Sequence, residues 1–564
     1  KLNETLKGLF KPIQHISSIF IMEIYRDSTW ILEDLIKQKE NNKLVSGSLK
    51  NIIISKHKQF KLNNKNLKNV FACTIEAYKH LDVLEYLYEN MSSLEAALTK
   101  LEATKGKVPN KVTLYLMFND ALFSKNKRIQ LPNNHYLKKF MDSINKNLNK
   151  QWEMFKKINK VNSIDEYLAK KTGADKPIDQ PPVRWFRLNL AKLRTFEKIN
   201  QVKNEIIANF KHNVDSWKAV QENQDCIYED EFIPNLFAVS MDFKISKCKW
   251  YKSGQIIIQD RGSCFPLEIL DVKKTDYIMD CCAAPGNKTS LLGGYIYVKD
   301  RLESVDEDAQ PIYEEDEDSI PRVVAFEKND KRSDVLNTMM KNAGFETRKF
   351  NPDLTVSEQT EDYFNDDTLR IDIFHGDFST LCNNQRNNDI YKSKFFKFNK
   401  AILDPSCSGS GIYGRQSIDN LNKVDMERYT EKEGERLAKL SSFQTSLVSH
   451  AMKLPTLQKL TYSTCSVNTI ENEDVVIDLL MKHPDWEVIP KSESIPTWKR
   501  RGLDSAFEKY IDGEDCTLKG MSVKELLHVK DACIRLNKEE DGGIGFFVCG
   551  FQRKQLKKTK KGKK

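Results

Sequence analysis

The stretch Asp280-Cys281-Cys282-Ala283-Ala284-Pro285-Gly286-Asn287-Lys288-Thr289 decides the fold class of this 564-residue chain. It follows the short apolar segment Tyr277–Met279, which we predict to be a buried strand, and its last residues predict the start of a helix. Small residues between a strand and a helix let the backbone approach a ligand closely. This order is typical of a parallel α/β sheet that binds a nucleotide-like cofactor at its carboxyl edge.

Four further segments downstream repeat the pattern of a short apolar strand. They are Val323–Phe326, Ile371–Phe374, Ala401–Leu403 and Lys459–Tyr462. Because helix-like sequence alternates with these strands, we predict a doubly wound, Rossmann-like sheet over residues 271–552. The acidic segment from Glu303 to Asp318 is predicted to be a solvated loop between the first two strands.

An acidic side chain follows the second and the third of these strands. Glu327 comes directly after Val323–Phe326, and Asp377 follows Ile371–Phe374. In such a sheet the first acid can accept the hydroxyls of a ribose, and the second can contact an adenine. With the small-residue loop they predict a dinucleotide or S-adenosylmethionine site. The loop lacks both G-x-G-x-x-G and the first glycine of a P-loop, which argues against nicotinamide and nucleoside triphosphates.

Two cysteines lie just after the last two predicted strands. Cys407 belongs to Asp404-Pro405-Ser406-Cys407-Ser408, and Cys465 belongs to Tyr462-Ser463-Thr464-Cys465-Ser466. A thiolate that adds to carbon 6 of a pyrimidine makes carbon 5 nucleophilic, and a base must later remove the C5 proton. Asp404 can stabilise the charge and proton balance of the ring. Most unpaired cysteines are small buried hydrophobic residues, but thiols in polar loops opposite a cofactor loop favour covalent catalysis.

These motifs resemble those of the NOP2/Sun (Nol1/Nop2/Sun) family of RNA cytosine-C5 methyltransferases. The resemblance covers about residues 181–553, including Gln259-Asp260-Arg261-Gly262-Ser263-Cys264-Phe265-Pro266 and Asp541-Gly542-Gly543-Ile544-Gly545-Phe546-Phe547. Asn287 and Ser406 depart from the general pattern of the family. They match the branch that methylates large-subunit ribosomal RNA, and the chain is most similar to the fungal (25S rRNA) members of that branch.

The resemblance implies a class I methyltransferase fold and assigns the site. Cys465 would attack C6, and Cys407 would assist release of the methylated base. S-adenosylmethionine would be bound by Cys282, Ala283, Ala284, Pro285, Gly286, Asn287, Lys288, Glu327, Arg332, Asp377 and Asp404. By position alone, Arg332 is more typical of a surface residue, since it lies in the helix after a strand.

The implied product is 5-methylcytosine in large-subunit rRNA, made in the nucleolus on rRNA or a pre-ribosomal particle. Two alternatives stay open. The chain could be a ribosome-assembly factor that binds RNA and whose catalysis is secondary, or a methyltransferase that acts on tRNA.

Two further domains are predicted before the sheet. Residues 1–165 have long helix-like stretches and predict a helical domain, and residues 181–270 predict a small α+β RNA-binding domain. The basic residues of the latter include Arg184, Arg187 and Lys192, and its aromatic residues include Trp185, Phe186, Trp250 and Tyr251. Such aromatic residues either stack on RNA bases or form the core. Arg415, Arg500 and Arg501 are candidate phosphate contacts nearer the thiols.

Composition excludes several classes of protein. The net charge is +9, but eight basic residues lie in 553–564, a predicted disordered tail that either binds polyanions, directs nuclear import or is merely solvated. The twelve cysteines show no zinc-ligand spacing, so we expect no metal and a reducing compartment. No apolar run reaches the about 20 residues of a membrane helix. Ile16–Tyr25 predicts an amphipathic helix rather than a secretory signal, and Met22 is a candidate start.

Overall fold

The computed structural model divides the chain into two compact units, Lys1–Gln180 with Gly414–Glu431 and Pro181–Tyr413 with Lys432–Lys564. It describes residues 22–37, 49–63, 66–124, 126, 127, 129, 131–172, 181–273, 275–299, 322–350, 369–380, 398–413, 426–511 and 521–554. The acidic segment Glu303–Asp318 and the tail beyond residue 554 lie outside these ranges.

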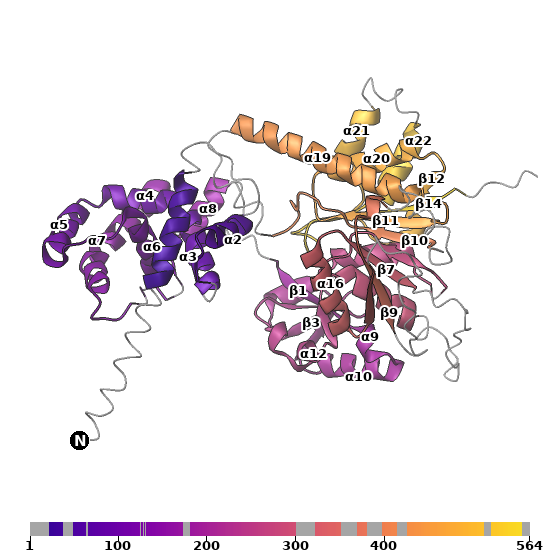
Figure 1. The fold of residues 1–564 in the computed structure, drawn as a ribbon, viewed down its shortest axis with the longest axis horizontal. Coiled ribbons are helices and arrows are strands. Elements are labelled where there is room, and N and C mark those ends of the chain that lie inside the picture. The colour runs from indigo at the N-terminus through magenta and orange to yellow at the C-terminus, as the bar shows by residue number, and fades with distance from the viewer. Residues whose placement is uncertain are drawn as a thin grey trace, which may run out of the picture. The chain divides into compact units, whose positions relative to one another are not determined.

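The first unit is helical, as its sequence pattern predicts (Figure 1, indigo to purple). Residues 22–37 form a helix, followed by α2 (Leu49–Gln59), α3 (Leu67–Lys79), α4 (Leu81–Asn90), α5 (Ser93–Lys105), α6 (Lys111–Leu122), α7 (Tyr136–Asn159) and α8 (Ile164–Thr172). The unit has its own hydrophobic core, in which Leu84 and Leu116 are fully buried. Within the described ranges no helix combines the length and hydropathy needed to cross a membrane.

The second unit begins with a five-stranded sheet in the order β2-β3-β4-β1-β5. The strands are β1 (Val183–Leu188), β2 (His212–Val214), β3 (Cys226–Glu229), β4 (Leu236–Ser240) and β5 (Ile256–Ile258). Helices α9 (Leu190–Leu193), α10 (Phe196–Ile207), α11 (Trp217–Glu222), α12 (Lys249–Lys252) and α13 (Phe265–Leu270) accompany them. Strand β1 pairs antiparallel with both β4 and β5, so it lies inside the sheet.

Several residues that could have formed a basic and aromatic RNA-binding surface are buried instead. Trp185, Phe186 and Trp250 are buried and therefore belong to the core, whereas Tyr251 is 41% exposed. Arg187 is also buried, at 2% exposure, so it cannot contribute to a basic face.

The larger sheet has the strand order β12-β14-β11-β10-β6-β7-β9-β8, with β13 paired to β14. Its strands are β6 (Ile278–Asp280), β7 (Val323–Glu327), β8 (Glu346–Phe350), β9 (Arg370–His375), β10 (Lys400–Leu403), β11 (Lys459–Thr464), β12 (Trp486–Val488), β13 (Ile534–Leu536) and β14 (Phe546–Arg553). All five strands predicted from the sequence are present. The six neighbouring strands β11, β10, β6, β7, β9 and β8 run parallel, and β14 is antiparallel to β11.

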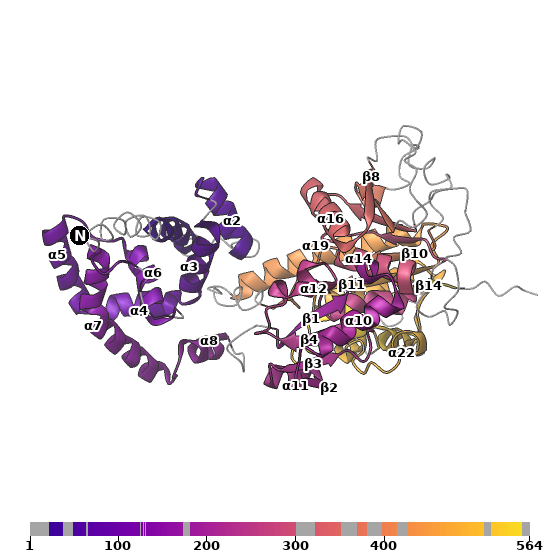
Figure 2. The same ribbon diagram turned by 90° about the horizontal axis from the view of Figure 1, so that it is seen from below.

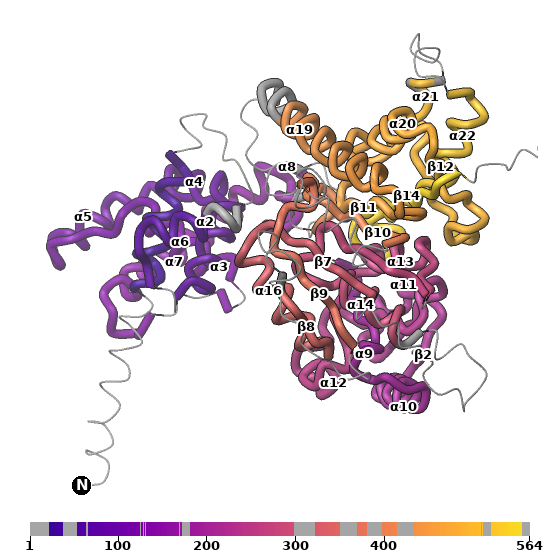
Figure 3. Tube along the Cα trace, turned by 45° about the vertical axis from the view of Figure 1, so that its right-hand side comes forward, coloured from indigo at the N-terminus to yellow at the C-terminus, as the bar shows by residue number. Residues whose placement is uncertain are grey.

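Helices connect several of the parallel strands, as a doubly wound sheet predicts (Figures 2 and 3). In the chain, α14 (Asn287–Gly294) lies between β6 and β7, α16 (Asp330–Ala343) between β7 and β8, and α19 (Met426–Met452) between β10 and β11. Three further helices follow β11, the last parallel strand: α20 (Glu473–Lys482), α21 (Asp504–Ile511) and α22 (Val523–Ala532). From β6 the chain adds β7, then β8 at the outer edge and β9 between them, and it returns to β10 on the other side of β6. This reversal between β6 and β10 is where ligands bind in open α/β sheets.

One hydrophobic cluster joins the two sheets of the second unit. It contains Phe186 and Phe237 of the small sheet together with Ile278, Val323 and Ile402 of the large one. The division into separate domains at about residue 270 therefore stays a prediction.

The predicted tail begins too early, because Arg553 is the last residue of β14 and its guanidinium is 2.7 Å from a carboxylate oxygen of Asp485.

Candidate active site

The loop that follows β6 is closed by a buried carboxylate. Asp280, at the end of β6, accepts hydrogen bonds from Thr289 Oγ1 (2.7 Å) and from the Cys282 amide (3.3 Å), which lie on opposite sides of the loop. Burial raises the pKa of Asp280 to about 6. Gly286 has φ 116°, and an added Cβ would lie 2.6 Å from Met340 Cε, so this position requires glycine.

Neighbouring strands fix the backbone of the same loop. The Cys281 amide donates to Ile402 O in β10, and the Ala283 amide donates to Phe326 O in β7, both at 3.0 Å. The side-chain oxygen of Asn287 is buried and accepts no hydrogen bond within the described part of the chain. The loop thus offers a backbone held on both sides and one unused buried acceptor.

Glu327 and Arg332 contact each other at the end of β7. Glu327 is buried, and its carboxylate accepts from the Asn329 amide (2.8 Å) and is 3.3 Å from Arg332 Nη2. The same nitrogen of Arg332 donates to Ala284 O at 2.8 Å. The Arg332 side chain is 54% exposed, as its position in the helix after a strand suggests, yet its guanidinium also reaches the loop after β6.

Asp377 follows β9 at the same edge of the sheet. Its carboxylate accepts from the amide (2.9 Å) and the hydroxyl (2.7 Å) of Ser379 and from Lys328 Nζ (2.7 Å). Burial raises the pKa of Asp377, but these hydrogen bonds lower it more, so the net pKa lies below its usual value. Asp377 is therefore an anion at neutral pH.

An ion pair connects the loop after β6 to the loops that carry the cysteines. Lys288 Nζ lies 2.7 Å from Asp404 Oδ2, and Ser463 Oγ donates to Asp404 Oδ1 at 3.0 Å. Burial lowers the pKa of Lys288, but the charge of Asp404 raises it more, so Lys288 remains protonated. Asp404 follows β10 and Ser463 lies in β11, so one carboxylate connects three neighbouring strand ends.

The two thiols lie side by side. Cys407 Sγ and Cys465 Sγ are 3.0 Å apart and share a hydrogen bond. That bond and burial raise the pKa of Cys407 far above its usual range, so Cys407 stays protonated at neutral pH. The two cysteine loops also meet through their backbones, because the Gly411 amide donates to Cys465 O and the Gly545 amide donates to Gly411 O, both at 2.9 Å.

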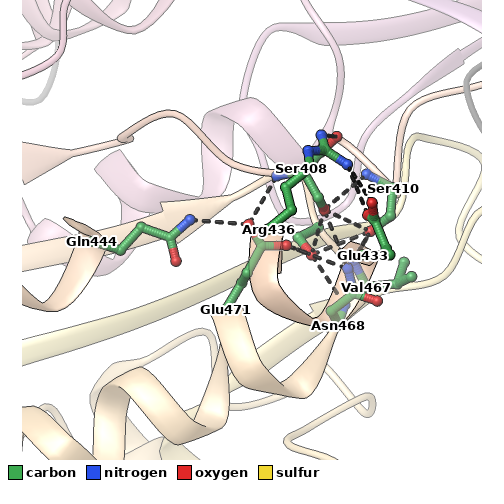
Figure 4. A network of polar contacts seen from close by, with 9 residues as sticks. Ser408, Ser410, Glu433, Arg436, Gln444, Val467, Asn468 and Glu471 are labelled. Carbon is green, nitrogen blue, oxygen red and sulfur yellow. Dashed lines mark hydrogen bonds and ion pairs between the residues drawn. The ribbon is translucent and has the colours of Figure 1, made fainter. Parts of the chain in front are cut away.

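A polar network connects the residues that follow the two cysteines (Figure 4). Its centre is the carboxylate of Glu471, which is fully buried and reaches both loops. Gln444 of α19 donates to Glu471 Oε1 and to Ser406 O, each at 3.1 Å. Sequence reasoning missed Glu471 and Gln444, and the only available signal was that Glu471 follows Cys465 closely.

A hollow of about 390 Å³ adjoins Cys407. Its lining residues are Cys407, Glu435, Arg436, Lys439 and Leu440, the last four from α19. The α19 residues were not predicted, because a charged helix in a sequence does not reveal which element it faces. The Cys407 thiol forms one wall of the hollow, and the other carries the cations Arg436 and Lys439 beside the acidic Glu435. Arg436 is also 2.7 Å from Glu433. Cationic side chains of this kind are suited to a phosphate.

The predicted phosphate contacts fare differently. Arg501 is buried and donates to the backbone oxygens of Ser494, Ile495 and Trp498, so its prediction is wrong. Arg500 is paired with Asp541 and Glu540. Arg415 lies outside the described residues.

Arg187 connects the small sheet to the helix after the cofactor loop. Its guanidinium donates to Gln259 Oε1 (2.6 Å), Ser290 Oγ (2.7 Å) and Asn287 O (3.1 Å). Burial lowers the pKa of Arg187 to about 10. Among the residues the structure describes, no group of histidine, cysteine and acidic side chains is arranged to bind a metal.

Comparisons with known proteins show what this chain is similar to. A family model described as "16S rRNA methyltransferase RsmB/F" matches residues 358–511. The chain is 29% identical over 537 residues to the 25S rRNA (cytosine-C(5))-methyltransferase rcm1 of Schizosaccharomyces pombe, covering 95% of this chain and 92% of that protein. It is 25% identical over 405 residues to the 28S rRNA (cytosine-C(5))-methyltransferase of Mus musculus, covering 72% and 69%. A solved methyltransferase homologue from Pyrococcus horikoshii is 20% identical, with a TM-score of 0.42 over 69% of this chain and 90% of that one.

Proposed function

We propose that this chain is an RNA methyltransferase of the RsmB/F (NOP2/Sun) family and makes 5-methylcytosine in large-subunit rRNA with S-adenosylmethionine as methyl donor. The matching family model and the rRNA cytosine-C5 methyltransferases that the chain resembles support this proposal. The observation that carries the proposal is the pair of sulfur atoms 3.0 Å apart beside the loop after β6. The nucleus, and the nucleolus within it, is the expected compartment, with rRNA or a pre-ribosomal particle as partner.

The residues present fit an adenosyl methyl donor. The loop after β6 combines small buried residues, Ala283 and Ala284, with the unused buried acceptor of Asn287. Glu327 would accept the ribose hydroxyls, and Asp377 would contact the adenine from the same edge. When bound, S-adenosylmethionine supplies a methyl group on a sulfonium centre.

The chemistry assigned to this chain uses both thiols and one carboxylate. Cys465 Sγ forms a bond to C6 of the cytosine, and the electron pair of the C5=C6 bond becomes available at C5 for methylation. Cys407 would assist the final step, in which the C5 proton passes to a base such as solvent water, the C5=C6 double bond re-forms and Cys465 leaves C6 as a thiolate. Asp404 would face N3 of the ring, with Lys288 holding it in place at 2.7 Å.

A stacked base cannot present C6 to a thiol, so the target cytosine must be unstacked or taken from a loop. The hollow beside Cys407 supports this requirement, since it is open to the α19 side chains Arg436 and Lys439. Both cations are suited to the phosphates that flank the target nucleotide.

The decisive experiment compares bisulfite sequencing of rRNA from cells with and without this protein. A cytosine that is protected in large-subunit rRNA only when the protein is present supports the proposal, and protection confined to tRNA supports the tRNA alternative. Purified Cys465→Ala should bind S-adenosylmethionine but transfer no methyl group, and Cys407→Ala should accumulate a protein–RNA complex that survives a denaturing gel. If Cys465→Ala methylates RNA like the wild type, the covalent mechanism is wrong.

Cells that lack the protein separate the assembly-factor alternative. If Cys465→Ala restores growth and ribosome assembly as fully as the wild type does, RNA binding is the main role. If it restores neither, the methylation itself is required.

A further inference from the structure

Glu471 touches both cysteine loops through one carboxylate. It ends the short 3-10 turn η8 (Thr469–Glu471), and its side chain is fully buried. Oε1 accepts from the amide of Ser408 at 2.8 Å, and Oε2 accepts from the hydroxyl of Ser466 at 2.6 Å. Ser408 directly follows Cys407, and Ser466 directly follows Cys465, so each thiol is one residue away from this anchor.

Two further donors complete the coordination of the carboxylate. Gln444 Nε2 lies 3.1 Å from Oε1, and Asn468 Nδ2 lies 3.3 Å from Oε2, so each oxygen accepts two hydrogen bonds (Figure 4). Burial raises the pKa of Glu471, but the hydrogen bonds from Ser408 and Ser466 lower it more. The net pKa lies below its usual value, so the group is an anion in the folded protein.

We propose that Glu471 is a positioning residue whose carboxylate sets the separation of the Cys407 and Cys465 sulfur atoms. The inference rests on the proposed function for its catalytic consequence, but not for its geometric one. A carboxylate is required because only an acceptor on both oxygens can bind donors from two loops at once. An amide at this position would turn its NH₂ group toward donors and release at least one loop.

The two loops also contact each other without Glu471. The Gly411 amide donates to Cys465 O at 2.9 Å, and the hydroxyl oxygens of Ser408 and Ser410 each lie 3.2 Å from Ser466 Oγ. Glu471 differs from these contacts because its one carboxylate accepts from both residues that directly follow the thiols. Its removal takes the acceptor from the Ser408 amide and leaves the Ser466 hydroxyl with neutral partners, so both residues next to the thiols are held less firmly.

The test measures thiol separation without relying on methyl transfer. An aryl trivalent arsenical forms two As–S bonds with a pair of adjacent thiols, and peptide mass spectrometry identifies the Cys407–Cys465 product. Glu471→Gln should slow this bridging by about 10-fold or more, since the lost charged hydrogen bonds are each of that magnitude. It should lower kcat for RNA by a similar factor while KM for RNA and S-adenosylmethionine binding stay unchanged.

Asp372→Asn is the matched control. Asp372 is equally buried in the same unit but is paired with Arg370 on β9, away from the thiols. It should lower the unfolding temperature without slowing arsenical bridging, which separates positioning from general destabilisation. If Glu471→Gln does not fold, Ser466→Ala removes one of the four donors and should slow bridging by a smaller factor.

Bridging and kcat in Glu471→Gln that equal those of the wild type overturn the inference. So does an equal loss of bridging in Asp372→Asn. If the wild-type protein bridges the arsenical but methylates no RNA, the proposed function fails, and slower bridging in Glu471→Gln still supports the positioning role.

Discussion

Gly411 lies where three backbone segments meet, and its replacement by alanine should push the cysteine loops apart. An added Cβ would lie 2.0 Å from Gly545 O and 2.8 Å from Cys465 O. Because an ordinary contact begins at 3.4 Å, the first distance must grow by about 1.4 Å. Both neighbours are backbone atoms, so no side-chain rotation can relieve the overlap.

The cost follows from the contacts that must change. Overpacking costs about 1–3 kcal/mol. Separation also breaks the hydrogen bonds from the Gly411 amide to Cys465 O and from the Gly545 amide to Gly411 O, each worth about 1 kcal/mol. We therefore expect Gly411→Ala to reduce the free energy of unfolding of the second unit by about 3–5 kcal/mol. Methyl transfer should fall more than stability requires, because Cys465 moves with its carbonyl.

Urea unfolding followed by circular dichroism measures the first effect, and RNA methylation below the unfolding midpoint measures the second. Gly434→Ala is the control, since Gly434 lies in α19 with no atom within 4 Å of an added Cβ. That substitution should be neutral or stabilise by up to about 1 kcal/mol. If Gly411→Ala unfolds at the wild-type urea concentration and retains full activity, the described meeting of the three segments is wrong.

Three further predictions follow from buried or exposed charges. Burial raises the pKa of Asp280 from 3.8 to about 6 in the folded state, so the folded state binds more protons than the unfolded state, and the free energy of unfolding falls by up to about 3 kcal/mol as pH rises from 3.8 to above 6. Asp280→Asn should remove this pH dependence in unfolding measurements at several pH values, and an unchanged profile would refute the prediction. Arg187→Met removes the donors to Asn287 O and Ser290, so it should destabilise the second unit by about 2–4 kcal/mol and weaken S-adenosylmethionine binding measured by calorimetry. Binding equal to that of the wild type would contradict a role of Arg187 in holding the loop after β6. Replacing both Arg436 and Lys439 by glutamate should raise KM for RNA several-fold at low salt and by a smaller factor at high salt. An effect on KM that does not depend on salt would argue against phosphate contacts.

The sequence predicts the centre of the large sheet well, because its strands are short apolar or β-branched segments and its loops carry the small and acidic residues. Val323–Glu327 is almost wholly apolar, whereas Lys459–Thr464 alternates Leu460 and Tyr462 with polar residues, and each strand is buried along nearly its whole length. The antiparallel strand β14 (Phe546–Arg553) is equally apolar, but its pairing with β11 depends on contacts distant in the chain. No local pattern encodes that pairing.

The candidate site shows the same division between local and distant information. The spacing of each loop after its strand identifies Asp280, Glu327 and the two cysteines. It does not identify partners, which is why Arg187 was expected on an RNA-binding face and is instead buried against α14. Glu471 was missed because its importance depends on two donors that come from different strand ends.

The hydrophobic cluster that contains both Phe186 and Ile278 has a consequence for how the second unit unfolds. Neither sheet can lose its partner without exposing aromatic and aliphatic side chains to water, so denaturation should proceed in one cooperative transition for residues 181–554. A fragment that ends near residue 270 would lack half of its interior and should aggregate rather than bind RNA on its own.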